Sequence, residues 1–218
     1  MKKIFFGLLI FSAISIFAVF VSCDSDKVVS SDRFVGTWIQ NSLETEIVIT
    51  TEGEFKINSV DEDFDGLTGT YVTTTTGATI LIDGIEQEYS LILLEKDAFK
   101  LELPQDLGGD AYFVKQRDVN LNLSGTWKNS DNSVVAKLND VNDSLVVTIG
   151  SGSDAIVLNG KFQDEDNMFF MYIVVEYDNS EFLEEIGSGV VSASGKAYTF
   201  CMDANGDWSS TILMKTSE

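Results

Sequence analysis

The sequence predicts an all-β protein: two small antiparallel meander barrels or sandwiches in tandem, after an N-terminal signal segment. Short apolar runs of strand length recur along the chain, and turn residues separate them. Only one segment, 181–186, has the pattern of a helical turn. A set of landmarks in the first half also returns in the same order in the second half. We therefore expect seven or eight strands in each unit.

The N-terminal segment has the layout of an export signal. Two lysines precede an uncharged apolar run from Ile4 to Ser22, and Cys23 follows it. The end of this run, Phe20-Val21-Ser22-Cys23, resembles the lipobox of bacterial lipoproteins, with Phe20 in place of the usual Leu, Val or Ile. The resemblance implies that residues 1–22 are a signal peptide and that Cys23 carries acyl chains such as palmitate. Residues 23–32 would then form a tether.

An uncleaved anchor helix is the alternative, because 19 uncharged residues approach the ~20 that span a bilayer. Both interpretations export the rest of the chain and make a bacterial membrane its partner. We expect the outer membrane, although an acid directly after the cysteine, here Asp24, favours the inner membrane in enteric bacteria.

Charge and composition exclude several function classes. Removing residues 1–22 takes away two lysines and leaves 12 basic against 35 acidic residues, a net charge of −23. Such a surface repels nucleic acid. The chain has no histidine, which excludes Ser-His-Asp and Cys-His catalysis and zinc sites with histidine ligands. Its two cysteines are Cys23 and Cys201, so a lipidated Cys23 leaves Cys201 as a buried strand thiol without a disulfide partner.

An internal duplication organises the remainder of the chain. Gly36-Thr37-Trp38 recurs 89 residues later as Gly125-Thr126-Trp127. Three further matches follow in the same order, namely Leu67–Tyr71 with Leu158–Phe162, Ala98–Leu103 with Ala197–Met202, and a Gly-Asp turn before a strand ending near Lys115 or Lys215. These matches predict one β domain over residues 33–118 and a second over residues 119–218.

Within these domains, alternation and apolar runs locate the strands. The expected strands include Glu46–Thr50, Phe55–Ile57, Ala78–Ile82, Tyr89–Leu94, Phe99–Leu103, Leu145–Ile149 and Met168–Val175. Turns are expected at Glu52-Gly53, Thr76-Gly77, Asp83-Gly84, Asn142-Asp143, Asp178-Asn179 and Ser194-Gly195. Pro104, the single proline, is expected to end a strand, where its missing N–H is tolerated.

The opening Gly-x-Trp, the central Gly-x-aromatic strand and the terminal lysine of each unit resemble small lipocalin-like domains of bacterial lipoproteins. The resemblance covers most of residues 33–216 and implies that Trp38 and Trp127 each plug one end of a barrel. Both units are far shorter than a ligand-carrying lipocalin. A barrel this short is expected to be filled by its own side chains.

One motif suggests a metal. Asp61, Asp63 and Asp65 with Gly66 match the first half of a calcium loop, in which alternate carboxylates converge on a hard cation. The twelfth position is Val72 instead of a bidentate glutamate, so an acidic hairpin loop is the competing interpretation. Calcium is the only cofactor that the sequence suggests.

No group of residues identifies a catalytic site, and we assign no catalytic residue. The apolar segment Phe169–Tyr172 is interpreted as a core strand, with a pocket wall as the alternative. The expected function is that of an exported, lipid-anchored binding or interaction lipoprotein with an unknown protein partner or small ligand, and not an enzyme. Two alternatives stay open: a carrier of a small apolar ligand in a barrel cavity, and a carboxylate-based hydrolase.

The lipidation hypothesis gives a direct test. Cys23→Ala should release the protein from bacterial membranes, since each buried acyl methylene contributes ~0.8 kcal/mol to anchoring. Fractionation of cells into membrane and soluble material measures the change. Continued membrane association of the variant would instead indicate an uncleaved helix.

Overall fold

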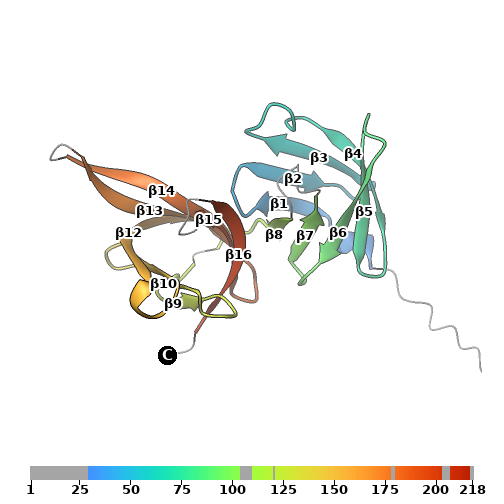
Figure 1. Ribbon diagram of the computed structural model, residues 1–218. Helices are drawn as coiled ribbons and strands as arrows, with labels where there is room; N and C mark the ends of the chain where they lie inside the picture. The colour runs from blue at the N-terminus through green and yellow to red at the C-terminus, as the bar shows by residue number, and fades with distance from the viewer. Residues whose placement is uncertain (1–28, 104–109, 120, 178–179, 203–206, 217–218) are drawn as a thin grey trace, which may run out of the picture.

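A computed structural model describes residues 29–103, 110–119, 121–177, 180–202 and 207–216 of the chain. These residues form two closed eight-stranded antiparallel barrels in tandem (Figure 1), which confirms the predicted all-β architecture. The choice between barrels and sandwiches is thereby settled in favour of barrels. No helix among the described residues is long and apolar enough to cross a membrane. Cys23 and Pro104 lie outside the described residues.

The first barrel follows the short 3₁₀ helix η1 (Ser31–Arg33) and runs as a meander in which each strand pairs with the next. Its strands are β1 (Gly36–Gln40), β2 (Thr45–Ile49), β3 (Glu54–Ser59), β4 (Thr68–Thr73), β5 (Gly77–Ile82), β6 (Glu88–Leu93), β7 (Ala98–Glu102) and β8 (Ala111–Lys115). The barrel closes where β1 pairs with β8. Alternation sets the inward face: Phe55 and Ile57 are buried, and Lys56 between them is exposed.

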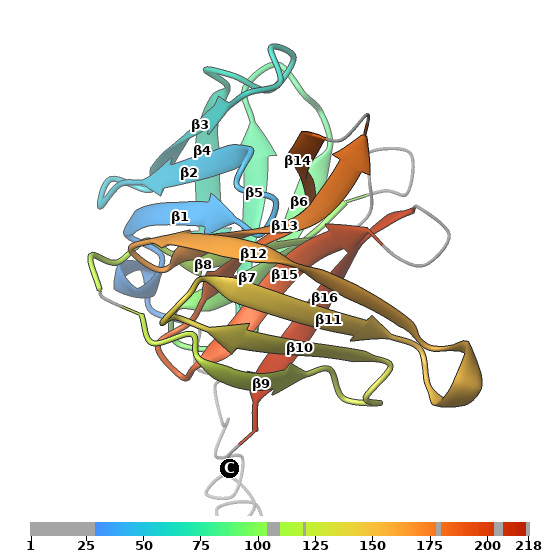
Figure 2. The same ribbon diagram turned by 90° about the vertical axis from the view of Figure 1, so that its left-hand side faces the viewer.

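The second barrel, in front of the first in Figure 2, repeats this topology and closes where β16 pairs with β9. Its strands are β9 (Gly125–Lys128), β10 (Val134–Asn139), β11 (Ser144–Ile149), β12 (Ile156–Glu165), β13 (Met168–Tyr177), β14 (Ser180–Val191), β15 (Lys196–Met202) and β16 (Trp208–Lys215). A second 3₁₀ helix, η3 (Gly152–Asp154), lies between β11 and β12. Because β12, β13 and β14 are longer than their counterparts, this barrel is less regular than the first.

The helical turn expected at 181–186 is wrong. These residues belong to β14, where Leu183 pairs with Val174 and Phe182 with Val175 on β13. Local sequence pattern favoured a helix, but a long partner strand satisfies the backbone hydrogen bonds of this segment in extended form. Tertiary pairing therefore overrides the local preference.

The sequence landmarks fall on equivalent strands with one correction. Both Gly-Thr-Trp segments lie in the first strand of their barrel, and Gly69 and Gly160 lie in β4 and β12. The sequence match paired Ala98 with Ala197, yet Ala98 contacts the other barrel, whereas Ala197 faces its own core. The cross-strand registers instead align Phe99 with Ala197. A shift of one residue exchanges the two faces of a strand, so this difference decides which side chains fill each barrel.

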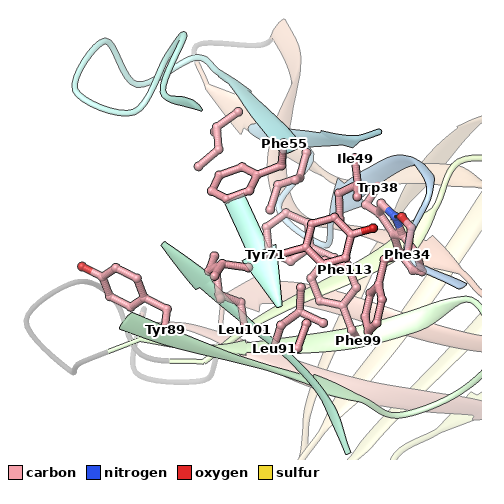
Figure 3. Close-up of a cluster of buried hydrophobic side chains, with 14 of the residues drawn as sticks. Phe34, Trp38, Ile49, Phe55, Tyr71, Tyr89, Leu91, Phe99, Leu101 and Phe113 are labelled. Atoms are coloured by element: carbon pink, nitrogen blue, oxygen red, sulfur yellow. The ribbon is translucent and has the colours of Figure 1, made fainter. Parts of the chain in front are cut away.

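A buried tryptophan occupies the same position in both barrels. Trp38 is fully buried, and its indole Nε1 donates a hydrogen bond to the carbonyl oxygen of Phe34 at 2.6 Å. Trp127 donates to the carbonyl of Leu123 at 2.8 Å. Figure 3 shows Trp38, Phe34 and Phe99 gathered at one side of the first core, well away from Tyr89. In both cases the backbone carbonyl four positions earlier satisfies the buried indole N–H.

A lysine at the end of the last strand completes this arrangement. The ammonium of Lys115 lies 5.7 Å from the ring centre of Trp38 and donates to the carbonyl of Val35. Lys215 lies 5.8 Å from the ring of Trp127 and donates to the carbonyl of Asn122. The φ of Gly36 is 132°, which favours glycine, and a β-carbon there would lie 2.6 Å from Cε of Lys115 and displace the end of that side chain.

The two barrels pack side by side through an apolar contact. β1 and β8 of the first barrel lie against β14 and β15 of the second. Ile39, Ala98 and Val114 form one buried cluster with Val190 and Tyr198. Burial raises the pKa of the Tyr198 hydroxyl, and its ring lies 5.8 Å from that of Tyr112. The outward faces of these strands are therefore part of a core that the two barrels share.

Polar groups seal both edges of this contact. Asn41 is buried, and its side-chain amide donates to the carbonyl of Thr199 at 2.8 Å and to Ser210 at 3.0 Å. Asn167 of the second barrel donates to the carbonyl of Lys115 at 3.0 Å and accepts from the backbone N–H of Arg117. Each buried amide finds partners across the contact, so removing one partner while the barrels stay packed would leave an unsatisfied polar group.

Charged groups add to the contact at the β6–β7 turn. Glu95 pairs with Lys196, and Asp97 pairs with Arg117 at 3.6 Å. Burial opposes ionisation of Glu95, but hydrogen bonds from Lys196, Ser194 and Ser192 outweigh it and lower its pKa. These interactions fix the turn of the first barrel against the β14–β15 turn of the second.

Truncation of the two buried tryptophans tests their structural role. Trp38→Ala and Trp127→Ala should each lower the free energy of unfolding by ~3–5 kcal/mol, because each removes a large buried ring and leaves a cavity. Trp208→Ala is the matched control, since Trp208 is 44% exposed. Chemical denaturation measures all three. An effect at Trp208 as large as at the other two would contradict the assignment.

Candidate functional site

The second barrel contains an internal cavity of about 410 Å³. Apolar side chains from six strands form its walls, among them Val147, Met171, Ile186 and Leu213. Asn129, Ser133 and Ser209 supply polar groups where the β9–β10 and β15–β16 connections begin and end. The cavity thus lies at the end of the barrel away from Trp127 and combines an apolar interior with a polar rim.

Side-chain size at matched positions explains part of this space. In the first barrel, Phe99 and Phe113 stack inside with ring centres 5.1 Å apart. The registers place Ala197 and Leu213 at these positions in the second barrel. Leu213 fills less volume than Phe113 and forms part of the cavity wall, whereas Ala197 lies at the filled end beside Trp127. Beside Trp127 the interior of the barrel is almost filled and has a cavity of only about 10 Å³.

The first barrel has a smaller cavity of about 250 Å³ at its corresponding end. Ile47, Ile80 and Phe113 are among its walls, and Phe64 and Ile85 lie at its lip. Glu44 and Asp61 also line it. Carboxylates in the lining make this cavity less suitable for an apolar molecule than the cavity of the second barrel.

The expectation that both short barrels are filled by their own side chains is therefore wrong. Each is filled only at the tryptophan end, where the aromatic side chains gather. The sequence does carry one signal of the difference, because the second unit has Leu213, in the wall of the larger cavity, where the first has Phe113.

Cys201 is the one reactive side chain in the wall of the larger cavity. It lies on β15 and is a free thiol, half-buried, as expected for a strand thiol. Burial raises the pKa of Cys201 to about 11, while a hydrogen bond involving Thr199 opposes this effect weakly. A neutral thiol adds to the apolar character of the wall and makes a poor nucleophile.

The predicted calcium residues lie in the loop between β3 and β4. One carboxylate oxygen of Asp61 accepts the backbone N–H of Asp63 at 3.0 Å, and Asp65 accepts that of Ser59 at 3.1 Å. These are the bonds of a self-contained acidic loop. Within the described part of the chain, no three acidic or cysteine side chains are placed to share a metal ion. Calcium binding at this loop stays a prediction.

The segment Phe169–Tyr172 contributes to both the core and the cavity. Phe169 is buried and Met171 forms part of the cavity wall, while Phe170 and Tyr172 stack on each other with ring centres 6.4 Å apart. The segment is therefore both a core strand and part of a pocket wall, the two interpretations that the sequence left open. The walls of the larger cavity include no carboxylate among the described residues, so a hydrolytic pair is not found there.

No known protein family model matches this chain, and no curated protein matches it. Function must therefore be inferred from the site itself.

The thiol of Cys201 provides a test of this environment. At pH 8 it should react with a small maleimide about a hundredfold more slowly than a free cysteine of pKa ~8.5, because so little of it is thiolate. The rate should rise about tenfold per pH unit up to pH 10. Mass spectrometry of the peptide that contains Cys201 follows the reaction, with free cysteine as the reference. A rate equal to that of free cysteine would contradict the apolar environment.

Proposed function

We propose that the protein is an exported, lipid-anchored binding protein that holds a small apolar ligand in the cavity of its second barrel. The observation that carries the proposal is the apolar cavity of about 410 Å³. Small-molecule sites typically occupy ~300–1,000 Å³ and have mostly apolar walls with few polar groups.

The chemistry of the cavity supports binding more than catalysis. Its interior presents aliphatic and thioether groups, and the rim presents an amide and hydroxyls. These groups can orient a ligand by hydrogen bonds but supply neither a general base nor an activated nucleophile. The raised pKa of Cys201 is consistent with this passive role.

The N-terminal segment supports a location at a membrane surface. An acylated Cys23 would tether the barrels, and their strong negative charge would keep them in water away from anionic head groups. A tethered protein with an apolar cavity is suited to accept molecules that have low solubility in water. The same features do not require a protein partner.

Filling the cavity tests this proposal. Val147 points into the cavity, whereas Val146 on the same strand pairs with the outward-facing Lys137. Val147→Trp should abolish most of the fluorescence increase of N-phenyl-1-naphthylamine, an uncharged apolar probe, and Val146→Trp should not. Both variants contain the N-terminal apolar segment, so any probe that binds there adds the same fluorescence to each and does not affect the comparison.

Thermal melts of both variants show whether they fold. If Val147→Trp fails to fold, Ser209→Trp at the rim replaces it, since Ser209 also lines the cavity. Equal probe binding by wild type and by the folded cavity variants would overturn the proposed function.

A further inference from the structure

A free-standing hairpin extends one wall of the larger cavity beyond the barrel. The pairing of β12 with β13 ends at Gly160 and Ile173, and the pairing of β14 with β15 ends at Gly187 and Cys201. Beyond these points, among the described residues, β13 and β14 pair only with each other, as far as Tyr177 and Ser180. Figure 1 shows this hairpin projecting away from the rest of the second barrel. The cavity wall therefore continues past the rim on this side.

The inner face of the hairpin is apolar. Ile173 packs against the core of the second barrel, and Val175 pairs with Phe182 two positions farther out on the same face. Phe182 is 54% exposed. Across the opening, Ile156 pairs with the cavity residue Ile149 and is 41% exposed. Apolar surface thus continues outward from the cavity, which suits an elongated ligand better than a compact one.

One carboxylate interrupts this apolar face. Glu184 pairs with Ile173, so it lies on the inner face of β14 between Phe182 and the cavity residue Ile186. Within the described part of the chain, no lysine or arginine forms an ion pair with Glu184. The adjacent Glu185 pairs with Tyr172 and lies on the outer face. Glu184 is therefore an unpaired negative charge beside the path into the cavity.

No basic residue offsets this charge in the two connections at this end of the barrel that the structure describes in full. Residues 129–133 and 150–155 contain no lysine or arginine. An anionic head group would meet only like charges here, whereas a cationic one would gain attraction in partly apolar surroundings, where charges interact more strongly than in water.

We propose that the ligand is an elongated amphiphile with a cationic head group, whose chain fills the cavity and whose charge pairs with Glu184. This inference rests on the proposed function and adds to it the charge and shape of the ligand. The apolar chain accounts for the cavity and for the inner face of the hairpin. The positive head accounts for a carboxylate that forms no ion pair with any described residue.

A series of ligands with one chain length tests the charge. Dodecyltrimethylammonium, dodecanol and dodecanoate, each below its micellar concentration, compete with N-phenyl-1-naphthylamine for the full-length protein at pH 7. The ammonium compound should bind roughly three- to fivefold more tightly than the alcohol, as for a single exposed ion pair, and dodecanoate should bind most weakly. At 1 M salt the Debye length falls to ~3 Å, so the three should converge.

Two neighbouring substitutions separate the role of Glu184 from the overall acidity of the protein. Glu184→Gln should remove the preference for the ammonium compound and leave dodecanol binding unchanged. Glu185→Gln changes the net charge by the same amount on the outer face and should leave the preference intact. If both variants lose the preference equally, or if wild type binds dodecanoate as tightly as the ammonium compound, the inference is overturned.

The outcomes distinguish this inference from the proposed function. Dodecanol that competes with the probe in wild type, and that binds wild type but not Val147→Trp in isothermal titration calorimetry without the probe, supports the cavity as an apolar site whatever the head-group preference. Failure of all three compounds to compete would overturn the proposed function and the inference together. Equal binding of all three at low salt would overturn the inference alone.

Discussion

Closure of each barrel depends on contacts that join its last strand to its first. Lys115 ends β8, lies over the ring of Trp38 on β1 and donates to a carbonyl just before that strand. Gly36 leaves room for the lysine stem, and the indole N–H is satisfied by the segment that precedes β1. The second barrel repeats this arrangement with Trp127 and Lys215. A meander without such a closure would expose two strand edges, so the folding of everything between depends on it.

Filling one end of a barrel leaves the other end free to vary. In the first barrel stacked phenylalanines fill the middle of the interior, while in the second the smaller Leu213 takes the place of Phe113 and lines a cavity. The longer β13 and β14 then extend the wall of this cavity outward. One architecture therefore supports a well-filled barrel and a hollow one. Stability is concentrated at the closed ends, and the capacity to bind is concentrated at the open end of the second barrel.

The sequence was sufficient for the fold because strand alternation and turn residues are local signals. Gly53 and Gly84 lie in turns where they were expected, and the run from Met168 is a strand. The cavity and the hairpin could not be predicted in this way. The cavity depends on which side chains face each other across the barrel, and Leu183 is extended only because Val174 lies opposite. The contact between barrels was also missed, since apolar residues such as Val190 do not reveal which core they join.

The contact between the two barrels uses different strands on each side, β1 and β8 on one and β14 and β15 on the other. Contacts of this head-to-tail kind do not close on themselves, and like modules joined by them could form an open-ended row. One substitution explains how such growth is opposed. The position of Tyr198 in the shared core corresponds to Lys100 in the first barrel, which pairs with Glu102 and Asp110 on the surface. Burying that charged group under another module would cost its hydration, which opposes growth of such a row from this face of the first barrel.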